Sequence, residues 1–315
     1  MIYDCIVVGG GPAGLSAALV LGRCRRRVLV CDAGRPRNRR ARAAHGFLTR
    51  DGIAPAELLR IAKEQLAPYD SVELRAAEVV DAVRDADGYE VWCADGSRLL
   101  CRKLLLATGV VDELPAIDGI EPLYGVSVHH CPYCDGWEWR DQAIAIYGRG
   151  EQAAGLAQAL TAWSRDLLLC SDGPAELPDR TMERLESLGI PVREERVVRL
   201  EGRDGKLQRI VFERGAPAER RALFFSTGQH QASPLAARLG CAFTERGAVA
   251  TGKCEATNVP GLYVCGDASK EVQFVVVAAA EGAEAAVAIN KALLEEELAG
   301  QKSSSTPSRA SLGGP

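Results

Sequence analysis

The chain of 315 residues is long enough for about two domains with full hydrophobic cores. Its composition, 47% hydrophobic and 25% charged residues, is that of an ordinary globular protein, and its net charge of −4 argues against general affinity for nucleic acid. The longest apolar run, 275–280, is far shorter than the ~20 residues of a membrane span, and Met1 leads directly into a strand pattern. We therefore expect a cytoplasmic protein without a signal peptide or transmembrane segment.

Residues 2–8 predict a buried strand, which is followed by a G-x-G-x-x-G turn and a helical pattern over 15–21. The first glycine allows the tight turn, the second lets the backbone approach a pyrophosphate, and the third lets helix and strand pack closely. An acidic residue ends the next strand, 23 residues after the first glycine (32 − 9), where it suits a ribose diol. The pattern predicts a dinucleotide site formed by Gly9, Gly11, Pro12, Ala13, Gly14 and Asp32.

The same pattern recurs in the middle of the chain. A strand over 143–147 leads into a second glycine turn, a helix to about residue 164 and a strand over 167–170. An acidic residue again follows, 24 residues after the first glycine of the turn (172 − 148). The sequence therefore predicts a second nucleotide site formed by Gly148, Gly150, Ala153 and Asp172.

Between and after these two patterns the sequence predicts short strands and one long helix. Residues 71–106 alternate strand patterns with turns, 261–267 predict a strand that ends in an acidic residue, and 275–296 predict a helix. The tail of 299–315, rich in Ser, Gly and Pro, is expected to be disordered. Nine arginines between 23 and 42 are expected to form a solvated face, although such a run could also bind a phosphate or an acidic partner.

The segment 129–136, His-His-Cys-Pro-Tyr-Cys-Asp-Gly, carries the chemistry. A C-x-x-C pair can form a redox disulfide, half of a zinc site or a structural bridge. Zinc needs four ligands, and because a second ligand cluster is lacking in the sequence, we expect a redox pair and no metal site. A helix starting at Cys134 would direct N–H groups at its sulfur and favour the thiolate. His129 and His130 could move a thiol proton or only shape the loop.

In their order and spacing, these motifs resemble the low-molecular-weight thioredoxin reductase family over residues 1–298. The resemblance implies an α/β fold with two Rossmann-like dinucleotide-binding domains of three-layer ββα type, and a homodimer. The FAD domain would be discontinuous, formed by 1–113 and 230–298. The inserted domain, 114–229, would carry the cysteine pair.

The resemblance also implies roles for individual residues. Cys134 would lie next to the flavin, Cys131 would exchange with the substrate, and Asp135 would be the acid/base near the thiols. Because a histidine titrates near neutral pH, we expect His130 to assist Asp135 in moving protons. The further FAD-contacting positions that it implies are Val79, Thr108, Gly109, Gly266, Asp267, whose carboxylate would bond the ribityl chain, and Val275.

One departure from the family pattern concerns the electron donor. NADPH-using members carry a His-Arg-Arg type cluster after the second strand of the inserted domain, because a 2′-phosphate pairs with arginine. This chain has Ser171-Asp172-Gly173 there, so NADPH is an unfavourable ligand, and NADH or a second FAD suits the residues better. The same loss is found in diflavin-linked disulfide oxidoreductases and dithiol oxidases, which the 129–134 segment also resembles.

We therefore expect an FAD-dependent disulfide oxidoreductase that works in the thiol-oxidising direction on a dithiol small molecule or a thioredoxin-like protein. Two alternatives remain open. One is an NAD(P)H-dependent thioredoxin reductase in which another basic residue, such as Arg149 or Arg165, binds the nucleotide phosphate. The other is a non-catalytic flavin redox sensor that signals through a partner.

Overall fold

The computed structural model describes residues 2–304, and the chain forms two compact units. The first unit comprises the residues up to 35, residues 61–109 and those from 233 onwards; the second comprises 36–60 and 110–232. The chain thus passes between the units four times, after residues 35, 60, 109 and 232. Residues 36–60, which the sequence places with the first domain, cluster with the second unit.

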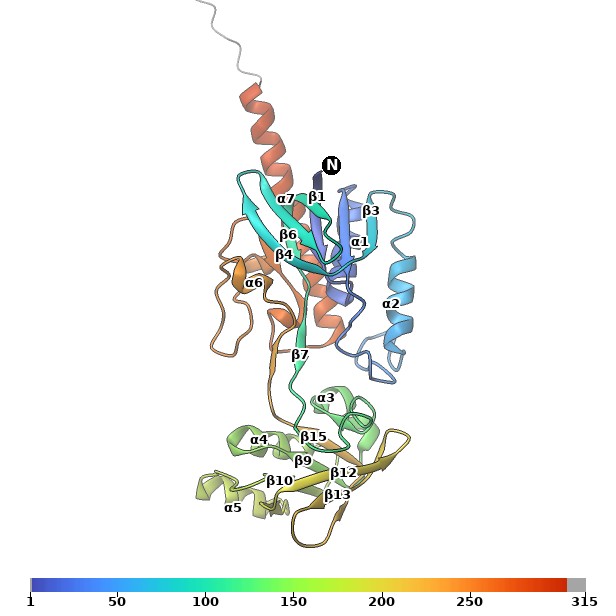
Figure 1. Ribbon diagram of the computed structural model, residues 1–315, viewed down its shortest axis with the longest axis vertical. Coiled ribbons are helices and arrows are strands. Elements are labelled where there is room, and N and C mark those ends of the chain that lie inside the picture. Colours follow the sequence, from blue (N-terminus) through green and yellow to red (C-terminus); the bar gives the residue numbers. More distant parts are fainter. Residues whose placement is uncertain (1, 305–315) are drawn as a thin grey trace, which may run out of the picture. The chain divides into compact units, whose positions relative to one another are not determined.

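The first unit is built on a seven-stranded mixed sheet (Figure 1). Its strands follow the order β3-β2-β1-β6-β5-β4, with β17 paired to β6. Strands β1, β2, β3, β6 and β17 are parallel, while β4 and β5 are antiparallel to their neighbours. The elements are β1 (Ile2–Val8), α1 (Pro12–Arg23), β2 (Val28–Asp32), β3 (Val72–Ala76), β4 (Val79–Asp85), β5 (Gly88–Cys93), β6 (Arg98–Leu106), α6 (Leu235–Arg238), η2 (Lys253–Glu255), β17 (Leu262–Val264), η3 (Gly266–Ala268) and α7 (Val275–Ser304). Helix α2 (Pro55–Glu64) crosses the boundary between the units.

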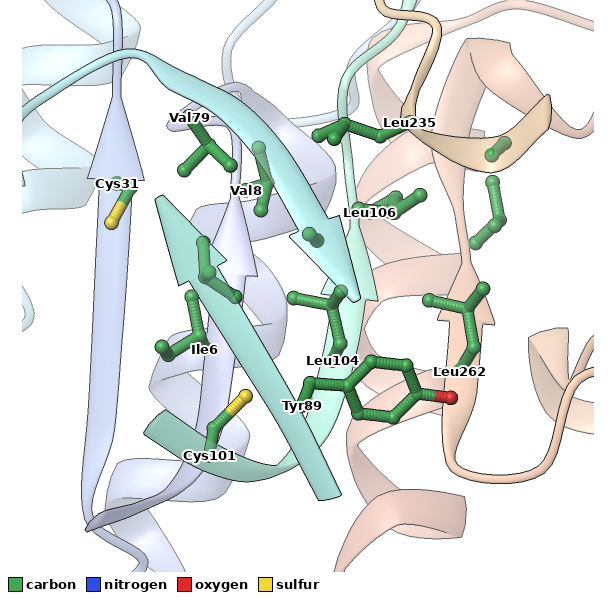
Figure 2. Packing of buried hydrophobic residues seen from close by; sticks show 14 of the residues in the cluster. Ile6, Val8, Cys31, Val79, Tyr89, Cys101, Leu104, Leu106, Leu235 and Leu262 are labelled. Carbon is green, nitrogen blue, oxygen red and sulfur yellow. The ribbon is translucent and has the colours of Figure 1, made fainter. Parts of the chain in front are cut away.

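The core of the first unit lies on the two faces of this sheet. The carboxyl-terminal halves of the inner strands β1 and β6, residues 5–8 and 104–106, are continuous apolar runs because both faces of the sheet are covered there, as parallel strands require. Ile6, Leu104 and Leu106 are fully buried and pack with Tyr89 and Leu262 (Figure 2). Helices α1 and α7 lie side by side, and the Ser16 hydroxyl donates a hydrogen bond to the Ala279 carbonyl across their contact (2.6 Å).

The second unit is built on a five-stranded sheet of order β11-β10-β9-β15-β8, in which all strands are parallel. An antiparallel sheet, β12-β13-β14, and a ribbon of β7 with β16 accompany it. The elements are β7 (Val110–Asp112), β8 (Val128–His129), α3 (Pro132–Asp135), η1 (Gly136–Trp139), β9 (Ile144–Tyr147), α4 (Gly150–Leu160), β10 (Leu167–Cys170), α5 (Asp179–Ser187), β11 (Val192–Arg193), β12 (Val197–Arg203), β13 (Lys206–Phe212), β14 (Ala218–Glu219), β15 (Ala222–Phe225) and β16 (Gln229–Gln231).

Two hydrophobic clusters give the second unit three layers. On one face of the parallel sheet, Ile144 and Ile146 pack with Leu160 of α4 and Leu185 of α5. On the other face, alternate residues of the same strands pack with residues of β12 and β13, such as Ile210. The alternation follows from the two-residue period of a strand, which turns successive side chains to opposite faces.

Most of the predicted elements are confirmed, and the start of the tail needs correction. The strands predicted over 2–8 and 167–170 are found with those bounds. The disordered tail was expected from residue 299, but α7 continues to Ser304 and that start is wrong; 305–315 lie outside the described residues. Over the part of the chain that is described, no helix is both long and apolar enough to cross a bilayer.

Candidate active site

The two cysteines of the C-x-x-C motif form a disulfide in the second unit. The Cα atoms of Cys131 and Cys134 are 5.3 Å apart, and helix α3 begins between the two cysteines, at Pro132. Cys131 is the N-cap, and its sulfur accepts a hydrogen bond from the backbone N–H of Cys134 (3.2 Å). The helix was expected to start at Cys134, so this prediction is wrong by two residues. The sulfur that accepts a backbone N–H at the helix start is therefore that of Cys131, and not that of Cys134.

Behind the disulfide, His129 connects Asp135 to Trp139. The His129 ring is 5% exposed, at the end of β8. The indole N–H of Trp139 donates to His129 Nε2 (3.0 Å), and His129 Nδ1 lies 3.3 Å from Asp135 Oδ1. The structure therefore brings Asp135 together with His129, and it gives Trp139 a polar contact in addition to its packing.

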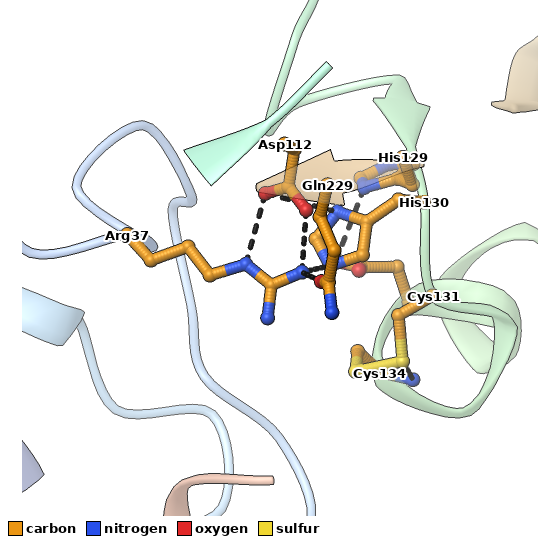
Figure 3. Close-up of a disulfide and its surroundings, with 8 residues drawn as sticks. Arg37, Asp112, His129, His130, Cys131, Cys134 and Gln229 are labelled. Atoms are coloured by element: carbon orange, nitrogen blue, oxygen red, sulfur yellow. Dashed lines mark hydrogen bonds and ion pairs between the residues drawn. A yellow bond between two sulfur atoms is a disulfide. The ribbon is translucent and has the colours of Figure 1, made fainter. Parts of the chain in front are cut away.

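His130 belongs to a different cluster, which centres on the buried carboxylate of Asp112 (Figure 3). Arg37 makes a two-pronged contact with Asp112, in which Nε donates to Oδ2 (2.9 Å) and Nη2 contacts Oδ1. The same Nη2 lies 3.1 Å from His130 Nε2 and 3.1 Å from the Gln229 amide oxygen. Tyr124 donates its hydroxyl to Asp112 Oδ2 (2.7 Å). Arg37 is thus an internal ion-pair partner, and for this residue the predicted solvated face is wrong.

The electrostatics of this cluster fix the state of His130. Burial alone would raise the pKa of Asp112, but the hydrogen bond and the charge of Arg37, together with the hydrogen bond from Tyr124, lower that pKa below its ordinary value. Burial lowers the pKa of His130, and Arg37 adds to this effect while Asp112 opposes it. A guanidinium can only donate, so Nε2 of His130 accepts, and the ring is neutral with its proton on Nδ1.

Sequence reasoning missed four of these side chains: Arg37, Asp112, Tyr124 and Gln229. These four residues come from distant parts of the chain. Asp112 and Gln229 meet because they lie opposite each other on the paired strands β7 and β16. The run of arginines was a signal for Arg37, but nothing distinguished it from its neighbours. The other three residues belong to no motif.

In the first unit, the predicted glycine turn has the geometry of a phosphate cradle. A Cβ atom at Gly14 would lie 2.0 Å from the Gly9 carbonyl oxygen, and one at Gly9 would lie 2.2 Å from the Ala107 oxygen. A Cβ at Gly11 would meet no atom within 4 Å, which leaves the backbone open at the start of α1. These are the requirements of a tight turn with room for a pyrophosphate at a helix N-terminus, so the residues fit FAD.

A cavity of about 470 Å³ continues from this turn past the end of β2. The Asp32 carboxylate on its wall accepts hydrogen bonds from the Gly34 N–H (3.0 Å) and the Lys63 ammonium (3.0 Å). Burial would raise the pKa of Asp32, but these donors outweigh it, and its pKa lies below the ordinary value. The residues lining the cavity include Gly10, Leu15, Val30, Asp32, Gly34 and Lys63.

Three predicted cofactor positions lie at the same edge of the first sheet. Gly9, Thr108 and Gly266 each follow one of the parallel strands β1, β6 and β17, whose carboxyl ends form the ligand-binding edge of such sheets. A Cβ at Gly266 would lie 3.0 Å from that of Ala13, so these turns are in contact. The other predicted positions are Gly109 after β6, Asp267 in η3, Val275 at the start of α7 and Val79 at the start of β4.

At the second glycine turn, internal contacts occupy the polar groups. The carboxylate of Asp172 accepts hydrogen bonds from the Tyr147 hydroxyl (3.0 Å) and the Val197 N–H (2.7 Å). The Arg149 guanidinium donates to the Ser171 carbonyl (2.8 Å) and to that of Asp172. Arg149 thus joins the glycine turn to the end of β10. Arg165, the other basic candidate, is exposed.

No group of three or more potential metal ligands is found within residues 2–304. The site therefore consists of a disulfide with an acid and two histidines beside it, in a chain whose other unit carries a dinucleotide turn. A redox disulfide in an α/β Rossmann-type protein of this kind defines the class of disulfide oxidoreductases.

Comparison with known proteins specifies the class. The chain belongs to the pyridine nucleotide-disulphide oxidoreductase family, whose model matches residues 3–282, and within it the chain is thioredoxin reductase-like. A protein of Claviceps purpurea named thioredoxin reductase tcpT is 33% identical over 313 residues, which cover 96% of this chain and 97% of the relative. The protein is thus an enzyme, a thioredoxin reductase-like disulfide oxidoreductase, and FAD is the cofactor expected for its family.

Solved structures agree with this assignment. The putative thioredoxin reductase TrxB of Bacillus anthracis is 34% identical, covers 94% of this chain and 99% of its own, and superposes with a TM-score of 0.89. A structure described as HlmI is 35% identical, covers 96% of both chains and has a TM-score of 0.92.

Proposed function

We propose that this protein oxidises dithiols, with electrons entering at the Cys131–Cys134 disulfide and leaving through FAD held by the first unit. A substrate thiolate attacks one sulfur of the disulfide, and the second substrate thiol resolves the mixed disulfide. The substrate leaves as a disulfide, and Cys131 and Cys134 remain as two thiols. Re-forming their disulfide releases two electrons and two protons. Bound FAD supplies the two-electron acceptor for this step.

The chain's own residues supply the thiol and proton chemistry. Cys131 is assigned the exchange with substrate because its sulfur receives the Cys134 N–H, and the resemblance assigns Cys134 the flavin side. Asp135, directly after Cys134 in α3, is assigned the acid/base role. His130 was expected to share that role, but both of its ring nitrogens face Arg37 and Asp112, so we assign it to holding the loop.

The observation that carries the proposed direction is the end of β10. There Asp172 stands in place of an arginine cluster, and a fixed carboxylate repels the 2′-phosphate of NADPH. The adjacent Arg149 is engaged with two backbone carbonyls. Reduction of the flavin by NADPH is therefore disfavoured. Reduction by a dithiol requires only the Cys131–Cys134 disulfide as its entry point.

Three alternatives are compared with this proposal: an NAD(P)H-dependent reductase, a second bound FAD and a redox sensor. The relatives named thioredoxin reductase favour an NAD(P)H-dependent reductase, in which Arg149 would leave the carbonyls of Ser171 and Asp172 and bind the phosphate. The glycine turn at Gly148 and Gly150 would alternatively hold a second FAD. A non-catalytic redox sensor would exchange electrons slowly with every donor.

An anaerobic titration of the purified protein separates these functions. We expect dithiothreitol to reduce the flavin within seconds and NADPH or NADH to reduce it at least 100-fold more slowly. Rapid reduction by NADPH would establish the reductase instead, and slow reduction by every donor would establish the sensor. The number of FAD molecules released per chain shows whether a second flavin is bound, because it approaches two only if the second unit binds FAD.

Replacing Cys134 with Ser tests the route of the electrons. The variant should keep its FAD, because Cys134 lies outside the dinucleotide turn, but its flavin should be reduced by dithiothreitol at least 1000-fold more slowly, since the disulfide is gone. Stopped-flow absorbance of the flavin measures the rate. Cys24→Ser, at an exposed free cysteine of the first unit, is the matched control and should retain the parental rate. A Cys134→Ser flavin that bleaches at the parental rate contradicts the scheme.

The proposal extends to assembly and location. The family resemblance supports a homodimer, which light scattering after size-exclusion chromatography would establish. The nine other cysteines are free, seven of them buried, which supports a reducing compartment such as the cytoplasm. The partner is proposed to be a dithiol small molecule or a thioredoxin-like protein.

A further inference from the structure

His129 lies too deep in the second unit to act on substrate directly. Its ring is 5% exposed, its backbone pairs with Phe224 of the neighbouring strand β15, and the two ring centroids are 5.3 Å apart. A buried polar ring at the end of a strand must have its nitrogens satisfied. Any effect of His129 on the reaction therefore acts through its hydrogen-bond partners.

Those partners define the protonation state of the ring. The indole N–H of Trp139 can only donate, so His129 Nε2, 3.0 Å away, must be an unprotonated acceptor. A neutral imidazole then carries its proton on Nδ1, which is 3.3 Å from Asp135 Oδ1. Trp139 thus selects the tautomer of His129 in which the proton lies on Nδ1, the nitrogen next to Asp135. In metal sites and catalytic triads, likewise, a partner at one ring nitrogen of a histidine fixes the tautomer and the orientation of the ring.

The neighbouring histidine is turned to other partners. His130 faces Arg37 and Asp112, whereas the charged side chain in contact with His129 is Asp135. Two adjacent histidines therefore bind two different carboxylates. The His129–Trp139 contact also closes the segment 129–139, which contains both cysteines.

We propose that His129, with its tautomer set by Trp139, is the positioning residue for Asp135. The Nδ1–H contact with Oδ1 holds one oxygen of the carboxylate and leaves the other to exchange protons with the cysteine thiols. His129 keeps its own proton throughout. Of the two protons released when the thiols re-form the disulfide, one passes to Asp135 and then to solvent, and the other would accompany the two electrons to bound FAD. This inference rests on the proposed role of Asp135 as the acid/base.

Three substitutions test the hydrogen bond separately from packing. His129→Phe keeps a ring beside Phe224 but lacks both nitrogens, and we expect flavin reduction by dithiothreitol to slow by 30-fold or more. His129→Asn places an amide N–H near the position of Nδ1 and should restore the rate to within about 5-fold of the parent. Trp139→Phe leaves the tautomer unselected and should slow the rate 3- to 10-fold. His230→Phe, on an exposed histidine of β16, is the matched control and should retain the parental rate.

Measurements on the holoenzyme separate the outcomes. FAD content and melting temperature are recorded for each variant, and the rate is followed between pH 5.5 and 9. A positioning role requires that His129→Phe moves the pH dependence as well as the rate while His129→Asn does not. If His129→Phe stays within 3-fold of the parent, or if His129→Asn is as slow as His129→Phe with both proteins holding FAD, the inference is wrong.

If the protein does not work in the thiol-oxidising direction, the result differs from a failure of the positioning role. In that case the parental flavin is not reduced by dithiothreitol but is reduced by NADPH. The same variants are then compared in NADPH-driven reduction of a small aromatic disulfide, where Asp135 donates protons to the thiols. The same order of rates, with His129→Phe slowest, would support the positioning role under either direction, and equal rates would refute it.

Discussion

At the scale of single residues, Glu281 is a buried carboxyl group that is hydrogen-bonded to Gly266, one of the predicted FAD positions. Its side chain, on α7, accepts the backbone N–H of Gly266 (2.7 Å) and is only 6% exposed. Burial and the neighbouring Glu255 raise its pKa from 4.5 to about 7. Glu281 thus holds the turn after β17 in place, but its charged form is penalised.

A pH dependence of stability follows from this pKa. Below pH 4.5 Glu281 is protonated in both the folded and the unfolded chain, so its contribution is fully present there. As the pH rises from 4.5 to about 7, only the unfolded chain loses the proton, and up to about 3 kcal/mol of stability is lost. Glu281→Gln stays neutral and keeps an acceptor for Gly266, so its free energy of unfolding at pH 8 should exceed that of the parent.

Denaturant unfolding of the holoprotein between pH 5 and 9 measures this effect. The parental curve should fall by about 1–3 kcal/mol more than the Glu281→Gln curve over this range. Glu284→Gln is the control, because this exposed glutamate lies on the same helix. Parallel curves for the parent and Glu281→Gln would show that Glu281 ionises in the folded protein as it does in the unfolded chain.

The site was predictable from the sequence where a motif carries its own geometry. Cys131 and Cys134 are three residues apart, and one turn of backbone brings their sulfurs together whatever the rest of the fold does. The partners of the two histidines were not predictable. Asp112 and Arg37 are separated by 75 residues, and their contact depends on where the loop after β2 packs, which no local pattern encodes.

At the scale of elements, the contact between α1 and α7 depends on one glycine. A Cβ atom at Gly282 would lie 2.0 Å from the Ala13 carbonyl oxygen, so the two helix backbones touch there without an intervening side chain. Ala13 belongs to the predicted FAD turn. The close approach therefore places the start of α1, and with it the phosphate cradle, against α7.

Gly282→Ala should separate the two helices. The added methyl meets backbone, which cannot swing away, so we expect a loss of about 1–3 kcal/mol of stability and weaker retention of FAD. Thermal unfolding and the FAD content after gel filtration are the measurements. Gly155→Ala in α4 is matched, because that helical glycine is exposed and its Cβ would meet nothing within 4 Å. It should gain about 0.5–1 kcal/mol. A similar gain in Gly282→Ala would contradict the close approach.

The bounds of an element could be predicted from the sequence where its burial requires a run of apolar residues. Strands β1 and β10 are short apolar runs bounded by turn residues, and both faces of each are covered, so pattern and structure coincide. The short helix α3 was misplaced because its start depends on one hydrogen bond to the Cys131 sulfur. The end of α7 was misplaced because composition suggested disorder in a segment that continues the helix to Ser304.

At the scale of the whole molecule, the residues that bound the large insertion are adjacent. Val110 of β7 pairs with Gln231 of β16, so the insertion leaves and re-enters the first unit through two neighbouring backbone strands. Opposite residues of an antiparallel pair lie about 5 Å apart. A short loop could thus replace 110–232 without separating β6 from the segment that leads to α6.

We expect a chain with a four-residue Gly/Ser linker between Gly109 and Ser233 to fold and bind FAD. The mixed sheet, its helices and the predicted dinucleotide turn all remain in this shortened chain. Its FAD content should be within 2-fold of that of the parent, while dithiothreitol should reduce its flavin no faster than it reduces free FAD, because the disulfide is absent. Residues 36–60, which cluster with the second unit, should become sensitive to proteases.

The control for this experiment is the full-length chain with Cys131→Ser and Cys134→Ser. It lacks the thiols but keeps the second unit, so it should bind FAD, resist dithiothreitol and keep 36–60 protected. If the shortened chain is unfolded or without FAD while the control retains both, the first unit is not an independent FAD domain, since its cofactor site then requires the insertion. If both hold FAD and differ only at 36–60, the second unit contributes the redox disulfide and the anchoring of that loop, and the first unit contributes the cofactor site.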